Sequence, residues 1–242
     1  MSADAPTILA TSGGFAPGTR TRFEVGPLTE YAIELARVSG RAPKVCFLAT
    51  AVGDNPLIIS AFHEAAMLRG LDASHLVLFP MPNVADPAAH LLDQDVIWVF
   101  GGSVAGLLAM WRLHGIDDAM RAAWQAGVVL TGSSAGSICW HVGGTTDSFG
   151  PDLHPISNGL GLVPYSNGVH YDSEAQRRPL FQRLVADGTL PEGYATDDGV
   201  GLLYRGTEFV TALAERDGAC AYHVERGPEG AAVETLIEPR RL

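Results

Sequence analysis

The first half of the chain alternates short apolar runs with segments whose apolar residues recur at helical spacing. Short apolar runs predict buried β-strands, and a repeat of about three to four residues predicts helices with one apolar face. The predicted strands are residues 7–11, 44–49, 75–79, 95–100 and 127–131, and the predicted helices are residues 28–38, 56–69, 103–112 and 117–125, with Ser103 and Asp117 as expected N-caps. Because such alternation builds a parallel sheet covered on both faces, we expect an α/β fold with a doubly wound, mostly parallel sheet flanked by helices.

The pattern changes after about residue 143. Residues 143–172 are dense in Gly, Pro, Asn and Asp, which predicts long, ordered loops. Residues 179–186 predict a short helix, and strand-like runs follow at residues 194–196, 201–204, 209–214 and 219–224. We expect these runs to form a C-terminal antiparallel extension of the sheet. No repeat or linker composition divides the chain, so residues 1–242 are expected to form a single domain.

Composition and charge narrow the classes of partner. The net charge is −11 and the pI about 5.0, so the average field repels a polyanion and we expect no nucleic acid partner. No apolar run approaches the about 18–20 residues that a membrane helix needs. The cysteines, Cys46, Cys139 and Cys220, are far apart and odd in number, which predicts neither a disulfide framework nor a metal site. We expect a cytoplasmic protein, a homo-oligomer (dimer), with no metal and no other cofactor.

Residues 127–140, GVVLTGSSAGSICW, contain a Gly-x-Ser-x-Gly motif between a predicted strand and a helical segment. This is the arrangement of a nucleophile elbow, in which side chains two residues before and after the serine would collide with neighbouring backbone. Ser134 has Gly132 and Gly136 at those positions, whereas Ser133 and Ser137 have no such glycine pair. Ser134 is therefore the candidate nucleophile. The alternative is that the motif is only a tight strand-to-helix turn.

A serine nucleophile needs a base, an orienting acid and an oxyanion hole. The backbone N–H of Ala135 follows the serine, and Gly102 in FGGSVAGLL can supply a second backbone donor. The residues alone leave the other partners open. The histidines beyond the elbow helix are His154, His170 and His223, and the candidate acids are Asp197 and Asp198. One alternative is an α/β-hydrolase esterase that uses Ser134, Asp198 and His223 in that chain order. Another is a non-catalytic binding protein on the same scaffold.

Residues 101–140, GGSVAGLLAMWRLHGIDDAMRAAWQAGVVLTGSSAGSICW, together with GLGLVP, VHYDSE and ATDDGVGL further on, resemble the peptidase E family of aspartyl dipeptidases and their cyanophycinase relatives. The resemblance implies a fold like that of class I glutamine amidotransferases, serine peptidase chemistry and no metal. By position, it makes Ser134 the nucleophile, His170 the base and Gly102 the second oxyanion donor, with Ala135 as the first. Asp198 falls where the family usually has glutamate.

The chain also departs from the family pattern. Ser103 stands where the motif usually has asparagine, and Glu174 falls where aspartyl-specific members place an arginine that grips the substrate carboxylate. Arg177 and Arg178 follow one turn later. We therefore expect a serine peptidase for small peptides that is not strictly aspartyl-specific, with Glu174 and Arg177 as substrate-binding residues. The alternative is that Glu174 is a solvated surface residue and that Arg177 or Arg178 grips the substrate.

Overall fold

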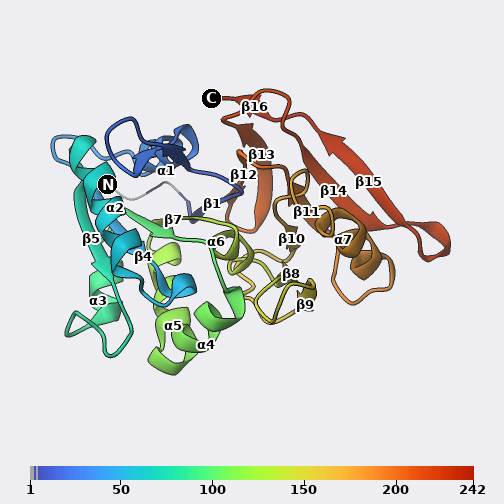
Figure 1. Cartoon of the computed structure of the whole chain (residues 1–242), viewed down its shortest axis with the longest axis horizontal. Coiled ribbons are helices and arrows are strands. Elements are labelled where there is room, and N and C mark those ends of the chain that lie inside the picture. Colours follow the sequence, from blue (N-terminus) through green and yellow to red (C-terminus); the bar gives the residue numbers. More distant parts are fainter. Residues whose placement is uncertain (1–2, 4) are drawn as a thin grey trace.

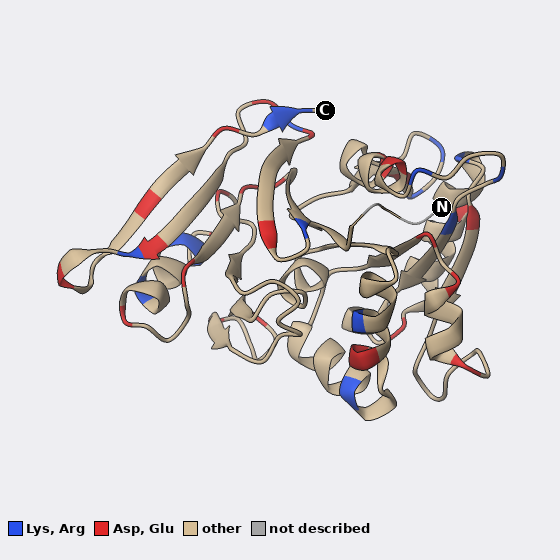
Figure 2. Ribbon diagram, turned by 180° about the vertical axis from the view of Figure 1, so that it is seen from behind, with Lys and Arg blue, Asp and Glu red and all other residues tan. Residues whose placement is uncertain are grey.

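The structure, a computed structural model, describes residue 3 and residues 5–242. Its largest sheet lies beside a second, smaller sheet (Figure 1 and Figure 2). Within the described residues, eight strands form the large sheet in the order β16 (Arg240–Arg241), β13 (Glu208–Ala214), β12 (Val200–Arg205), β1 (Thr7–Thr11), β7 (Val129–Ser133), β6 (Val96–Val99), β4 (Lys44–Leu48) and β5 (Asp72–Leu76). The strands from β1 to β5 in this order are parallel, whereas β12 is antiparallel to both β1 and β13.

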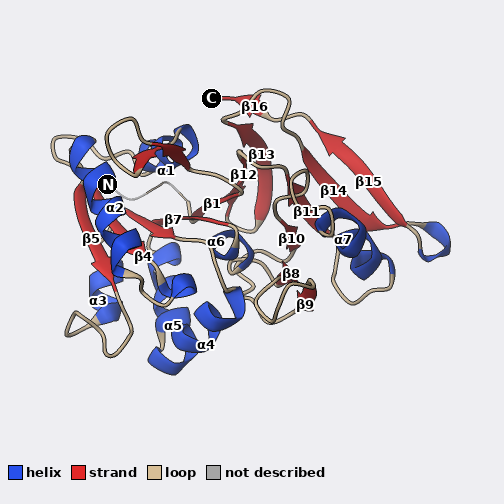
Figure 3. Ribbon diagram, viewed as in Figure 1, coloured by secondary structure: helices blue, strands red, loops and turns tan. Residues whose placement is uncertain are grey.

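Helices cover both faces of the large sheet (Figure 3). Successive residues of the parallel strands alternate between two buried clusters, as Ile97 and Trp98 do on β6. One face packs against α1 (Pro27–Leu35) and α2 (Pro56–Leu68), and the other against α3 (Pro87–Leu92), α4 (Val104–His114), α5 (Ile116–Gln125) and α6 (Ala135–Ile138). Because both faces of these strands are buried, they read as continuous apolar runs. The predicted α/β class, with a mostly parallel sheet flanked by helices, is confirmed.

Six further strands form the second sheet within the described residues. It consists, within the described residues, of β15 (Ala232–Ile237), β14 (Ala221–Arg226), β11 (Gly193–Thr196), β10 (Ser166–Gly168), β8 (Gly143–Thr146) and β9 (His154–Ile156), in that order. Helix α7 (Arg177–Ala186) packs on this sheet through Phe181 and Leu184, which share a buried cluster with Val224. The predicted loop region at residues 143–172 is therefore wrong in part, because it contributes β8, β9 and β10.

The sequence pattern missed β8 and β10 because their residues are small. A Cβ on Gly143 would lie 2.0 Å from Ile156 O, and one on Gly144 would lie 2.2 Å from Asn167 O. The neighbouring strands approach so closely that only glycine fits at these positions. Strands of this composition carry no alternation of apolar and polar side chains, so periodicity cannot detect them.

Several element boundaries also differ from the prediction. Strand β5 covers Asp72–Leu76 instead of residues 75–79. Asp117 is not an N-cap, because α5 begins one residue earlier and Gly115, with φ 69°, takes that position. Ser103 is an N-cap as predicted, since its Oγ accepts from Gly106 N at 3.1 Å. The short strands β2 (Phe15–Pro17) and β3 (Phe23–Val25) were not predicted.

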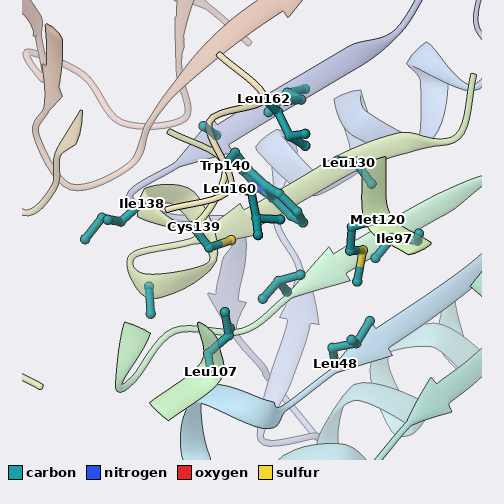
Figure 4. Close-up of a cluster of buried hydrophobic side chains, with 14 of the residues drawn as sticks. Leu48, Ile97, Leu107, Met120, Leu130, Ile138, Cys139, Trp140, Leu160 and Leu162 are labelled. Carbon is teal, nitrogen blue, oxygen red and sulfur yellow. The ribbon is translucent and has the colours of Figure 1, made fainter. Parts of the chain in front are cut away.

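A large apolar cluster lies between the parallel strands and α4–α6 (Figure 4). It joins Leu130 on β7 and Leu107 on α4 to residues that follow the candidate nucleophile, including Cys139 and Trp140. Both cysteines of this region, Cys46 and Cys139, are buried. The segment after the Gly-x-Ser-x-Gly motif is thus anchored in the apolar core. Within the described residues, no helix is both long enough and apolar enough to span a membrane.

His141 lies in this core, with no exposed surface, and its ring contacts Ser137 O through Nδ1 and Tyr204 Oη through Nε2. Burial lowers its pKa to about 4, whereas an unfolded histidine has a pKa of about 6.5. The folded-state pKa is depressed, so the unfolded chain binds more protons between these values. The free energy of unfolding should therefore fall as the pH drops from about 6.5 towards 4.

Between about pH 7 and about pH 4.5, the free energy of unfolding should decrease by about 2 kcal/mol less in His141→Gln than in the native protein. Urea unfolding of the native protein and the variant at both pH values measures this difference. His154→Gln, at an exposed histidine, is the matched control. Equal pH dependence in the native protein and in His141→Gln would show that His141 is not the group that titrates.

Candidate active site

Ser134 occupies a strained turn between β7 and α6. Its φ of 55° and ψ of −111° lie outside the regions that L-residues ordinarily adopt. Such a conformation costs about 1–3 kcal/mol and persists only where surrounding structure enforces it. Ser134 N donates to Thr11 O at 3.0 Å, which fixes the turn to the end of β1. The structure thus gives Ser134 the geometry expected of a nucleophile elbow.

The two glycines of the motif are sterically required. A Cβ on Gly132 would lie 2.5 Å from Gly136 O, and one on Gly136 would lie 2.2 Å from Val99 O. Strand β6 therefore passes directly beneath the turn. By contrast, Ser137 is fully buried and donates to Asn167 Oδ1 at 2.8 Å, so its hydroxyl is already engaged.

His170 and Asp198 are brought together from residues far apart in sequence. His170 Nδ1 lies 2.6 Å from Asp198 Oδ1. An ionised carboxylate can only accept, so in this pair Nδ1 carries the proton and Nε2 keeps a free lone pair. His170 also has positive φ, at 54°, two residues after the end of β10. The contact thus leaves Nε2 as the ring nitrogen that can accept a proton.

The end of β1 connects the two candidate groups. Ser134 is bonded to Thr11, and the next residue, Ser12, accepts from His170 N on its Oγ at 3.4 Å. Ser12 is buried, and its Oγ lies 2.7 Å from Thr196 Oγ1. No hydrogen bond joins Ser134 Oγ to His170 within the part of the chain that the structure describes. In enzymes such contacts often tighten only when substrate binds.

Asp197 and Asp198 have different surroundings. Asp197 is buried, and its Oδ2 accepts from Cys220 N at 2.9 Å. Burial raises the pKa of Asp197, against the opposing effect of that hydrogen bond. Asp198 is the residue that faces His170. The geometry thus favours Asp198 over its neighbour as the orienting acid, a choice that the sequence left open.

An ion pair holds the backbone of Asp198 from both sides. Asp172 Oδ1 accepts from Asp198 N at 2.9 Å, and Arg216 Nε donates to Asp198 O at 3.0 Å. Asp172 and Arg216 are themselves paired. Burial raises the pKa of Asp172, but the hydrogen bonds from Asp198 N and Arg216 outweigh it and hold that pKa below the usual value. We call Asp172 and Arg216 the acid clamp.

Sequence reasoning did not assign a role to Ser12, Asp172 or Arg216. Asp172 had a weak signal, since it lies in VHYDSE two residues after His170. Arg216 had none, because it is 44 positions further along the chain. Only the fold brings these residues to the same place.

Two glycines lie in the loop that follows β6, and the first of them lies beside Ser134. A Cβ on Gly101 would lie 3.2 Å from Ser134 Cβ, so this loop touches the candidate nucleophile. Gly102 has φ 132°, and a Cβ there would lie 2.4 Å from Ala51 O. Glycine is therefore needed for the loop to pass between Ala51 and the serine. The loop that contains Gly102 thus contacts Ser134 through Gly101, and Ala135 follows Ser134 directly in the chain.

The structure does not place His223 at this site. It lies on β14, where its Nε2 is 3.4 Å from Glu192 Oε2 and its ring packs on Tyr194. His223 and its neighbour Glu225 form, with Glu192, a group of ligand atoms within 4.8 Å of one another. Among the described contacts, none joins His223 to Asp198, so the esterase order of residues is not assembled.

Glu174 and Arg177 are paired with each other. Arg177 is only 2% exposed, and its Nε donates to Glu174 Oε2 at 2.7 Å while its Nη1 donates to Thr145 O at 2.6 Å. A guanidinium held in this way joins α7 to β8 and does not face solvent. This placement argues against the predicted substrate contact by Arg177. Arg178 pairs with Glu234 and lies over the rings of Tyr171 and Tyr222.

The chain is similar to known peptidases. Residues 8–212 match the family described as peptidase family S51. The Bacillus subtilis (strain 168) protein named "uncharacterized peptidase YgaJ" is 41% identical over 182 residues, which cover 75% of this chain and 78% of that protein. Peptidase E of Shewanella denitrificans is 28% identical over 192 residues, covering 74% and 79%. The crystal structure of a peptidase from an acI-B1 actinobacterium shares the fold, with a TM-score of 0.69 at 16% identity over 99% of this chain and 96% of that one.

The acid clamp predicts that loss of Arg216 lowers turnover, although Arg216 lies at the surface. Arg216→Ala frees one side of the Asp198 backbone, and small displacements of catalytic groups cost up to about 10²-fold in rate. We expect kcat for peptide hydrolysis to fall about tenfold or more with KM little changed, and Arg216→Lys to recover part of the loss.

Arg241→Ala is the matched control, since Arg241 is also 50% exposed and also pairs with an aspartate, Asp217. Exposed pairs of this kind contribute about 0–1 kcal/mol to stability, so both variants should unfold at similar urea concentrations. Equal kcat in Arg216→Ala and Arg241→Ala would show that the acid clamp does not contribute to turnover.

Proposed function

The chain belongs to peptidase family S51, and from that premise we propose that it is a serine peptidase whose triad is Ser134, His170 and Asp198. Membership of this family makes the protein a peptidase and confirms the resemblance to the peptidase E family. The observation that carries the finer proposal is the 2.6 Å contact between His170 Nδ1 and Asp198 Oδ1, together with the strained conformation of Ser134.

The proposed reaction is acyl transfer to water. Ser134 Oγ attacks the peptide carbonyl, and His170 Nε2 takes the hydroxyl proton and then gives it to the leaving amine. Water then attacks the acyl-enzyme with the same histidine as base. Asp198 holds the imidazole in the tautomer that leaves Nε2 free and stabilises the imidazolium that forms.

The oxyanion of the tetrahedral intermediate needs preorganised donors. We assign this role to the backbone N–H groups of Gly102 and Ala135, which come from the loops before and after the nucleophile. The contact of Gly101 with Ser134 supports this assignment. Loss of one such donor typically costs about 10²–10³ in rate. None of these steps uses a metal or another cofactor.

We further propose that the substrates are small peptides and that the enzyme is not strictly aspartyl-specific. A pocket for an aspartyl side chain needs a cation that can reach the carboxylate. Here Glu174 stands where the family places its arginine, and Arg177 is buried and engaged by Glu174 and Thr145. The single domain over residues 1–242, the homo-oligomer and the cytoplasmic location remain predictions.

The triad predicts which histidine is essential. Ser134→Ala and His170→Ala should each lower kcat/KM by about 10³-fold or more, because nucleophile and base act as one unit. His223→Ala should keep most of the activity, since His223 pairs with Glu192 away from Ser134. A serine-reactive phosphonate, located by peptide mapping, should label Ser134 and neither Ser133 nor Ser137. Loss of activity in His223→Ala with retention in His170→Ala would instead support the α/β-hydrolase order.

The engagement of Arg177 by Glu174 and Thr145 predicts the response to an N-terminal aspartate. We expect kcat/KM for Asp-Leu to be no higher than for Ala-Leu, because Glu174 replaces the family's arginine and the buried Arg177 is already engaged. A matched series of X-Leu dipeptides and longer peptides measures the preference. A tenfold or greater preference for X = Asp would mean that Glu174 does not face the substrate.

A further inference from the structure

We propose that the cavity between residues 147–153 and residues 174–176 binds the positively charged side chain of a lysine or arginine in the peptide substrate. This inference rests on the proposed function, because it identifies the substrate class of the same site. The cavity has a volume of about 610 Å³. We call it the cation pocket.

Both walls of the cation pocket are attached to the candidate active site. On one wall, Glu174 N donates to the backbone oxygen of His170 at 3.1 Å. On the other, Ser148 Oγ accepts from Ala105 N at 3.2 Å, at the start of the helix that follows Gly102. The two walls thus begin at the proposed base and next to the proposed oxyanion loop. Because both walls are bonded to segments of the proposed site, the proposal places in this space a side chain of the peptide bound at Ser134.

The walls combine apolar surface with carboxylates. Pro151, Leu153 and Ala175 line the cavity beside Asp147 and Glu174. Lysine and arginine side chains have the matching character, with an aliphatic stem that packs on apolar surface and a charged end. The space is also larger than a free α-ammonium group alone requires, which favours a long side chain over the peptide N-terminus.

The two carboxylates of the cation pocket differ in whether another residue already neutralises them. Glu174 is neutralised from behind by the buried guanidinium of Arg177. Among the described contacts, neither a hydrogen bond nor an ion pair engages the carboxylate of Asp147, which is exposed. The nearby cations are occupied, since Arg178 pairs with Glu234 and Arg216 with Asp172. Asp147 therefore supplies the net negative charge, and Glu174 supplies further acceptor oxygens.

This division decides which variant is informative. Glu174→Gln would leave the buried Arg177 without its carboxylate, which destabilises the protein for reasons unrelated to substrate. Asp147→Asn removes a charge without removing any described contact. Asp118→Asn, at an exposed aspartate on α5, is the matched control.

The first measurement is kcat/KM for Lys-Leu, Arg-Leu and norleucine-Leu, where norleucine has the stem of lysine without its charge. We expect at least a tenfold preference for lysine or arginine over norleucine in the native enzyme. The preference should fall to about threefold or less in Asp147→Asn and stay unchanged in Asp118→Asn. Hydrolysis that depends on Ser134 but shows no such preference would overturn the cation pocket and leave the proposed function standing.

The second measurement does not depend on catalysis. Calorimetric titration of Ser134→Ala with lysinamide and norleucinamide should give at least tenfold tighter binding of lysinamide, and Asp147→Asn in the same background should abolish the difference. This arm tests the pocket even if the native protein hydrolyses none of the peptides, a result that would instead refute the proposed function. Equal binding of the two amides would refute the pocket.

Discussion

The end of β1 holds the candidate site together. Thr11 O accepts from Ser134 N, and Ser12 Oγ accepts from His170 N, so the last residue of β1 and the residue after it fix the proposed nucleophile and the proposed base. Ser12 also donates its N–H to Val200 O and accepts from Gly199 N, next to Asp198. Ser12 is therefore the point where the elbow, the histidine segment and the acid loop meet. Its hydroxyl contacts Thr196 in the second sheet, which ties both sheets to the same residue.

This arrangement stabilises the strained backbone conformation of Ser134. A serine with φ 55° relaxes unless its neighbours prevent it. Here β6 lies beneath Gly132 and Gly136 so closely that a Cβ on Gly136 would lie 2.2 Å from Val99 O. Below the turn, Cys139 and Trp140 are fully buried in the apolar cluster. The packed core therefore holds the backbone of the half-buried Ser134 in place, which is a form of preorganisation that acyl transfer requires.

The parts of the fold that the sequence predicted are those in which side chains decide the structure. The parallel strands are buried on both faces, so their apolar runs and the helices between them were recognisable. Strands β8 and β10 consist of small residues whose close backbone contacts form them, and a Cβ on Gly143 would lie 2.0 Å from Ile156 O. Such contacts depend on the partner strand and leave no periodic signal.

The same distinction applies to the candidate site. Ser134 was predictable because the steric demands of an elbow are local and leave glycines at fixed spacing. The pairing of His170 with Asp198 followed from a family resemblance and not from any local rule. Arg177 shows the limit, because an arginine near a motif suggests an anion-binding role whether or not the fold buries it. The structure gives Arg177 a different role, in which it joins α7 to Thr145.

If Asp198 orients the histidine as proposed, the acid clamp explains how an aspartate can serve where the family usually has glutamate. Aspartate is shorter by one methylene, so its backbone must lie closer to the imidazole to keep the 2.6 Å contact between Asp198 Oδ1 and His170 Nδ1. A shorter side chain also has fewer rotamers with which to correct a misplaced backbone. Asp172 and Arg216 hold both backbone polar groups of Asp198, its N–H and its C=O. A longer side chain can adjust its rotamer to place the carboxylate. Here the fixed backbone of Asp198 places the carboxylate instead. Under the proposed mechanism, the clamp therefore acts through Asp198 on the imidazole and contributes to turnover, while contributing little to the stability of the fold.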